Sequence, residues 1–302
     1  MDHLRPPLYL ILCLLLTITG LFVITCFNLT SFGQLSDDKQ EKPKDVPTLK
    51  DPGLKAITVV EGLKRPTSMA FLGPDDFLVL EKNSGIVKRI VNGNILASPM
   101  LDVAVANDKE RGLLGVAVQS NNGDIKIDDD NYSRKGNNTY IFLYFTESSG
   151  LDGNDDCPYI NYCTEGADPK GNRLYRYQLS QDKLINPKLL LDLPANPGAD
   201  HIGGAIVSGP DNNIYLISGD GHSCSYDSCN NGTKKTVLNS QSANERNGKE
   251  FVGRGGILRV TPDGLTISEN GHGGLLGNDD PINKYFAYGI RNGFGIDFDP
   301  IT

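Results

Sequence analysis

The pattern of hydrophobic and polar positions divides the 302-residue chain into three parts. Residues 8–27 form an uncharged apolar run of about the length that a bilayer core requires of a helix. Residues 31–56 are polar and carry few large apolar side chains, which is typical of a linker. From residue 57 onward, short apolar stretches alternate with turns rich in Gly, Pro, Asp and Asn. The pattern predicts a membrane anchor or signal segment over 1–30, a stalk over 31–56 and a folded domain over 57–302.

The apolar stretches of the folded domain recur as groups of short strands. We expect strands at 68–72, 77–81 and 86–91, then at 112–118, 140–145 and 172–177, then at 203–211, 213–218 and 255–260, and a last one at 294–300. A recurring strand that is followed by Gly-Pro-Asp favours an all-β propeller over a β-sandwich. Three blades and one strand do not close a ring, so we expect the chain to be a fragment of a longer propeller.

The N-terminal run and the cysteines indicate a location outside the cytoplasm. An uncleaved anchor is favoured over a removed signal peptide, because the run is long and lacks a small-x-small cleavage site. Four cysteines form two closely spaced pairs, which favours short-loop disulfides over a zinc site. These cysteines are Cys157, Cys163, Cys224 and Cys229. We therefore expect a single-pass cell-membrane protein with its propeller outside, or a secreted protein if the segment is cleaved.

The net charge and the absence of common cofactor motifs exclude several classes of function. The chain carries 29 Lys and Arg against 37 Asp and Glu, a net charge of −8, with no basic stripe, so nucleic-acid binding is not expected. It contains no G-x-G-x-x-G between a strand and a helix, no phosphate-binding loop, no H-E-x-x-H and no G-x-S-x-G. An enzyme that uses a nicotinamide or a nucleotide is therefore not predicted.

Polar residues stand just before the first strand of three successive blades. Glu110 precedes the second blade, Asp200 and His201 precede the third, and Arg291 and Asn292 precede the fourth. Equivalent loops of a propeller converge on its central channel, so we expect these residues to share a pocket, although the segment around Glu110 also fits a solvated turn. A carboxylate that orients an imidazole suits a general base, and Arg and Asn suit carboxylates and carbonyl oxygens.

Over residues 57–302 the sequence resembles the glucose/sorbosone dehydrogenase family. The motifs that carry the resemblance are Gly62-Leu-Lys-Arg-Pro-Thr-Ser-Met-Ala-Phe71, Gly112-Leu-Leu-Gly, Asp200-His201, Gly209-Pro-Asp-Asn-Asn-Ile-Tyr215, Gly219-Asp-Gly, Gly255-Gly-Ile-Leu-Arg259 and Tyr288-Gly-Ile-Arg-Asn. The resemblance implies a six-bladed β-propeller of the soluble type that oxidises aldoses with pyrroloquinoline quinone (PQQ) and calcium and passes the electrons to an external acceptor.

The resemblance also implies roles for single residues. His201 matches the catalytic base that takes the proton of the anomeric hydroxyl while hydride passes to the quinone, and Asp200 matches the acid that orients it. Arg291 and Asn292 match the quinone-contacting pair. Glu110 stands where characterised members have a Gln, which is a departure from the family. The calcium ligands of the family come from later blades, so no metal ligand is assigned within this chain.

Two other functions are compatible with this sequence. The first is a non-catalytic extracellular propeller that binds a protein or a glycan, but such a binder has little need of an oriented base in its channel. The second is a propeller hydrolase such as a lactonase, which requires a metal held by several carboxylates and histidines. Glu110 and Asp200 alone do not supply that set. The sugar dehydrogenase is therefore the leading hypothesis.

Overall fold

The computed structural model describes residues 49–121, 125–128, 131–134, 138–149, 169–195, 198–221, 253–267 and 275–299. The chain divides into two compact units, Met1–Thr58 and Val59–Thr302. In the described part of the chain, no helix is long and apolar enough to cross a membrane. The predicted membrane segment at 8–27 and the cysteines Cys157, Cys163, Cys224 and Cys229 lie outside the described residues.

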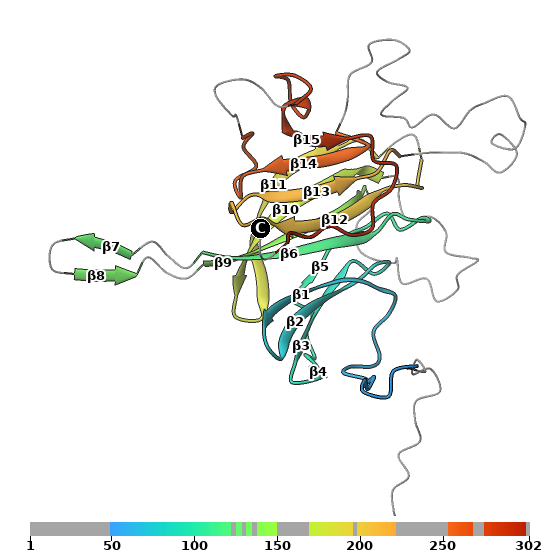
Figure 1. Ribbon diagram of the computed structural model, residues 1–302, viewed down its shortest axis with the longest axis vertical. Helices are drawn as coiled ribbons and strands as arrows, with labels where there is room; N and C mark the ends of the chain where they lie inside the picture. Colours follow the sequence, from blue (N-terminus) through green and yellow to red (C-terminus); the bar gives the residue numbers. More distant parts are fainter. Residues whose placement is uncertain are drawn as a thin grey trace, which may run out of the picture. The chain divides into compact units, whose positions relative to one another are not determined.

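The unit Val59–Thr302 is built from antiparallel sheets, and its described residues contain one short 3₁₀ helix, η1 (Ile282–Lys284), and no α-helix (Figure 1). The first sheet contains β1 (Pro66–Gly73), β2 (Asp76–Glu81), β3 (Ile86–Val91), β4 (Asn94–Ile95) and β5 (Leu101–Asp102). The second contains β6 (Leu113–Asn121), β9 (Asn138–Ser148), β10 (Pro169–Ser180) and β11 (Lys183–Leu193). The third contains β12 (Gly203–Ser208), β13 (Ile214–Ser218), β14 (Gly256–Val260) and β15 (Tyr285–Tyr288). A separate hairpin pairs β7 (Ile125–Asp128) with β8 (Asn131–Arg134). Sheets of consecutive antiparallel strands are consistent with the predicted all-β, propeller-like fold.

The second sheet is buried on both faces, which explains its nearly continuous apolar sequence. Along β9, Ile141, Leu143 and Phe145 enter a core cluster with residues of β2 and β3, such as Leu80 and Val87. The intervening Phe142 and Tyr144 enter a second cluster, with residues of β12, β13 and β14. Successive side chains of a strand point to opposite faces, so one strand supplies both clusters. The three sheets are therefore joined through two hydrophobic layers.

The first strands of the three sheets are neighbours. The hydroxyl of Thr67 on β1 donates a hydrogen bond of 2.8 Å to the carbonyl of Leu113 on β6. On the other side of β6, the backbone lies so close to β12 that a Cβ atom at Gly115 would be 1.9 Å from the carbonyl oxygen of Gly204. Only a residue without a side chain fits there. These first strands carry the loops of the candidate site.

Gly115→Ala is expected to destabilise the full-length protein by about 1–3 kcal/mol, because the added methyl group forces β6 and β12 apart. The matched control is Gly295→Ala, since a Cβ at Gly295 would meet nothing within 4 Å. Urea unfolding of both variants measures the difference. Equal free energies of unfolding for the two variants would show that β6 and β12 can move apart without loss of stability.

The structure places strands over all of the predicted segments before residue 261 and corrects the last one. Residues 294–299, the described part of the predicted strand 294–300, pair with no described strand. A strand is defined by backbone hydrogen bonds to a neighbour, so this segment does not count as one here. The fourth strands β11 and β15 complete the second and third sheets and were not predicted.

Candidate functional site

His201 lies in the loop between β11 and β12, in a tightly constrained backbone. Its φ angle is +57°, in the left-handed region that most residues avoid. Its carbonyl oxygen accepts the N–H of Gly221 at 3.1 Å. A Cβ atom at Gly219 would lie 2.0 Å from the same oxygen, so the loop after β13 is pressed against His201. Such strain persists where the surroundings hold it, and it often marks a functional site.

The imidazole of His201 contacts a buried carboxylate. Nδ1 of His201 lies 2.8 Å from Oδ1 of Asp220, and the two residues are only 8% and 1% exposed. A carboxylate accepts hydrogen bonds, so Nδ1 carries the proton and donates it to Asp220. The lone pair of a neutral imidazole then resides on Nε2. This geometry is that of an oriented general base.

Asp200 does not have the position that the resemblance implies. Its Oδ2 lies 2.9 Å from Nζ of Lys109, in an ion pair, and the carboxylate that the structure places on the imidazole is Asp220. The left-handed turn at His201 separates the direction of its side chain from that of its neighbour. The carboxylate in contact with the imidazole therefore comes from the loop after β13 and not from the residue before His201.

Glu110 joins the three predicted loops. Its Oε2 accepts the backbone N–H of His201 at 2.8 Å and the side-chain N–H of Asn292 at 2.9 Å. The other end of the Asn292 amide, Oδ1, accepts the N–H of Gly203 at 3.2 Å. The structure thus brings Glu110, His201 and Asn292 together. Here the Asn292 amide holds the loops, whereas the resemblance implied a contact with the quinone.

The two arginines of these loops differ in their surroundings. Arg111 is not in a solvated turn: its Nη2 donates to the carbonyls of Ala195 at 2.8 Å and Gly198 at 3.1 Å, in the segment before His201. The carbonyl of Arg291 accepts the N–H of Asp220 at 2.9 Å, so the loop before Asn292 also supports the buried acid. The Arg291 side chain is exposed, and its guanidinium makes no hydrogen bond or ion pair with another described residue.

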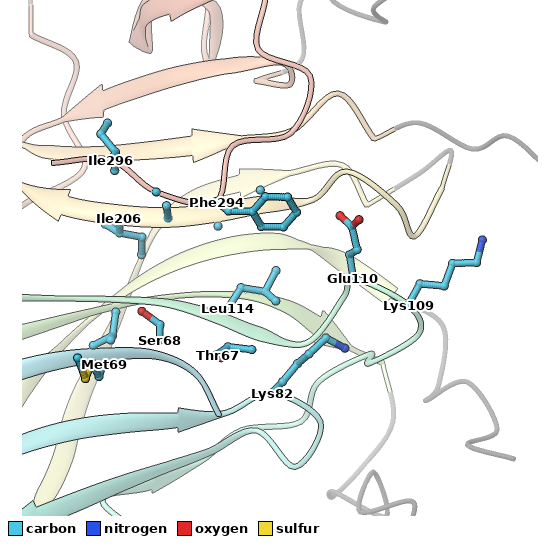
Figure 2. Close-up of a pocket in the computed structure, with 15 residues that line it drawn as sticks. Thr67, Ser68, Met69, Lys82, Lys109, Glu110, Leu114, Ile206, Phe294 and Ile296 are labelled. Carbon is cyan, nitrogen blue, oxygen red and sulfur yellow. The ribbon is translucent and has the colours of Figure 1, made fainter. Parts of the chain in front are cut away.

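A cavity of about 440 Å³ extends along the first strands from this site (Figure 2). Thr67 and Met69 of β1, Leu114 of β6, Ile206 of β12 and the segment 294–296 form its walls. Figure 2 shows three charged residues gathered at one end and apolar side chains at the other. The charged residues are Lys82, Lys109 and Glu110. His201 does not itself line the cavity; it is linked to the charged end through its backbone N–H, which donates to the lining residue Glu110.

A half-buried cation, Arg254, lies near Asp220. Arg254 precedes β14, and its side chain packs against the site of Gly221, where a Cβ would be 3.4 Å from its Cδ. Burial lowers the pKa of Arg254, while the nearby acids, among them Tyr144 and Asp220, oppose the shift. Burial also raises the pKa of the Tyr144 hydroxyl.

Comparison with known proteins gives the family. A model described as glucose/sorbosone dehydrogenase matches residues 63–302. The chain belongs to the glucose/sorbosone dehydrogenase family. An uncharacterized protein of Synechocystis sp. is 24% identical over 286 residues, which are 90% of this chain and 58% of that protein.

Solved structures show the same fold at low sequence identity. A putative oxidoreductase (glucose dehydrogenase) from Thermus thermophilus has a TM-score of 0.53 at 24% identity, and covers 81% of this chain and 57% of its own. A second structure, a glucose dehydrogenase, has a TM-score of 0.52 at 19% identity, and covers 80% and 60%. This member of the glucose/sorbosone dehydrogenase family therefore spans less than two thirds of the relatives that it matches.

Two residues of this glucose/sorbosone dehydrogenase family member escaped the sequence analysis as site residues. Asp220 follows β13 and Lys82 follows β2, so each stands after the second strand of its sheet. Asp220 belongs to the Gly219-Asp-Gly motif that carried the resemblance, but no role was given to it. A rule that adds the residues after each second strand to those before each first strand would have found both.

Proposed function

We propose that the full-length protein is a PQQ-dependent sugar dehydrogenase that oxidises the anomeric hydroxyl of aldoses or of related alcohols. The observation that carries the proposal is the buried pair of His201 and Asp220, with the N–H of His201 donating to Glu110, which lines the charged end of a cavity. Membership of the glucose/sorbosone dehydrogenase family supports an oxidoreductase. A protein that only bound a partner would not require this oriented base.

His201 has the features that proton abstraction requires. With Nδ1 donating to Asp220, the Nε2 lone pair takes the proton from a substrate hydroxyl. The imidazole becomes positively charged in that step, and the Asp220 carboxylate stabilises it at 2.8 Å. Because both residues are buried, little water competes for these contacts. The two electrons and the hydrogen of the substrate carbon must leave as hydride to an acceptor.

The described residues fit a planar, anionic quinone. The exposed Arg291 guanidinium offers a fork of donors for quinone or carboxylate oxygens. The Phe294 side chain lines the cavity and is 78% exposed, so it presents an aromatic face for a planar ring. When bound, PQQ supplies the acceptor for the hydride. No cluster of three or more His, Cys, Asp or Glu suited to a metal occurs among the described residues, so calcium enters the proposal only through the family.

The direct test is reconstitution of the full-length protein with calcium and PQQ, followed by dye reduction with a panel of aldoses. We expect reduction that depends on both the sugar and the PQQ and that stops when calcium is chelated. Calorimetry gives the affinity for PQQ independently of turnover. A well-folded protein that binds no PQQ would overturn the proposal and favour a propeller that binds a protein or a glycan.

Glu110→Ala is expected to destabilise the protein by about 1–3 kcal/mol, because the N–H groups of His201 and Asn292 lose their shared acceptor. Glu110→Gln retains an acceptor oxygen and should be within about 1 kcal/mol of wild type. Urea unfolding separates the two, with Glu61→Ala at an exposed position as the control. Equal losses for Ala and Gln would show that the charge, and not the shared acceptor, is what matters.

A further inference from the structure

Lys82 is a fixed part of the cavity wall that the proposed mechanism does not use. It begins the loop after β2, in the position that corresponds to Gly219 after β13. Its backbone N–H donates to the carbonyl of Arg65 at 3.1 Å, and its carbonyl accepts the N–H of Leu113 at 2.9 Å. Figure 2 shows its side chain at the charged end of the cavity, with Glu110. The ammonium group is therefore presented from a rigid backbone.

Among the residues that the structure describes, the Lys82 ammonium has only neutral hydrogen-bond partners. Its Nζ donates to the carbonyl of Asn107 at 3.1 Å and to Oδ1 of Asn83 at 3.2 Å. An ammonium group has three N–H donors, and among the described residues the third has no acceptor. The residue is half-buried and makes no ion pair with a described carboxylate. A cation that loses part of its hydration without a counter-ion is costly, and an anion in the cavity would relieve that cost.

The other lysine of the cavity wall, unlike Lys82, has a carboxylate partner. Lys109, the other cation of the cavity wall, forms an ion pair of 2.9 Å with Asp200. Burial is the main cause that lowers the pKa of Lys82, to about 8, and the cation of Arg65 adds to it. The carboxylates of Asp108 and Glu110 oppose this shift. Lys82 is thus protonated at neutral pH and loses its proton as the pH rises through about 8.

We propose that Lys82 binds a carboxylate group of the molecule that occupies the cavity. The inference rests on the proposed function, because it names the chemistry recognised by the same cavity. A carboxylate supplies the acceptor for the third N–H and a counter-charge for the ammonium. The cation of Lys82 also counters the repulsion between that carboxylate and Glu110 at the same end of the cavity. The carboxylate belongs either to PQQ or to an acidic sugar, and both share this chemistry.

The test is calorimetry on the full-length protein with three probes: PQQ, D-glucuronate and the neutral sugar D-glucose. Lys82→Met removes the charge at nearly constant length and is expected to weaken binding of the carboxylate-bearing ligand by about 10- to 100-fold. Lys82→Arg keeps a cation and should retain most of the affinity. Affinity for D-glucose should change less than about threefold. The control is Lys183→Met, at an exposed position of β11 outside the cavity.

The pH dependence gives a second readout. In the wild type, affinity for the carboxylate should fall above pH 8, by about tenfold per pH unit, because the ammonium becomes neutral. Lys82→Arg should abolish that fall, since a guanidinium stays charged over this range. The comparison of wild type with Lys82→Arg tests whether Lys82 binds the carboxylate even if Lys82→Met fails to fold.

The outcomes separate the sources of the carboxylate. Weaker binding of PQQ alone assigns the contact to the cofactor, and weaker binding of D-glucuronate alone assigns it to the substrate. A folded Lys82→Met variant with wild-type affinity for both overturns the proposal, as does a wild type that binds neither. Failure of the proposed function is a different result: it appears as an absence of PQQ-dependent dye reduction, whereas D-glucuronate binding is measured without PQQ.

Discussion

His201→Asn in the full-length protein is expected to lower kcat/KM for aldose oxidation by on the order of 10²- to 10⁴-fold, the usual contribution of a general base. Asparagine is chosen because His201 has a φ of +57°, a conformation that Asn tolerates better than Ala. The variant therefore keeps the backbone turn and replaces the imidazole, with its basic Nε2, by an amide that is not basic. Steady-state dye reduction with saturating PQQ gives the rate.

The affinity for PQQ serves as the control for His201→Asn. We expect calorimetry to give a dissociation constant within about threefold of wild type, because the imidazole acts on the substrate proton. A variant with nearly unchanged turnover would remove His201 from the mechanism. Loss of PQQ binding together with turnover would instead show that His201 belongs to the cofactor site.

Asp220→Asn is expected to have the second-largest effect, about 10²- to 10⁴-fold on kcat/KM, with stability close to wild type. The amide has the shape of the carboxylate but presents an N–H donor as well. It can donate to Nδ1 of His201, and the proton of the neutral imidazole then moves to Nε2. That tautomer has no lone pair directed at the substrate.

Nitrogen-15 NMR of the imidazole distinguishes this positioning role from a structural one. In the wild type Nδ1 should carry the proton, and in Asp220→Asn the signals should indicate protonation of Nε2. Asp200→Asn is the matched comparison, because Asp200 pairs with Lys109. Equal losses of turnover in the two variants, with no change of tautomer, would contradict the assignment of Asp220 as the orienting acid.

Most of the strands could be predicted from hydrophobic alternation, and the exceptions have physical causes. β11 was missed because Lys183–Leu193 packs with only part of its length: five consecutive residues, 185–189, are exposed, and Pro187 interrupts the pattern. Residues 294–299 show the opposite case, since an apolar segment is found but no described strand pairs with it. Alternation reports which side chains are buried, whereas a strand also requires a partner.

The site was predictable in part. The loops that carry Glu110, His201 and Asn292 could be found because each precedes the first strand of a repeat. The pairing of His201 with Asp220 could not, because it joins two loops that are 19 residues apart. The adjacent Asp200 was the obvious candidate in the sequence, but a left-handed turn directs it to Lys109. Proximity along the chain is a weak guide to proximity of side chains in a turn.

The bridging carboxylate of Glu110 has a consequence for the order of folding. Most strands pair with the next or previous strand in sequence, the exceptions being β6 with β9 and β3 with β5, so the sheets form largely from contacts closer in sequence than those of the site. Glu110, by contrast, contacts His201 and Asn292, which are 91 and 182 residues away. Closing such long loops is slow, and these contacts are rewarded only once the sheets are in place. A nascent chain would therefore contain formed sheets before it contained a site, and pulse-labelled hydrogen exchange should show the His201 amide, which donates to Glu110, gaining protection after those of β2 and β3.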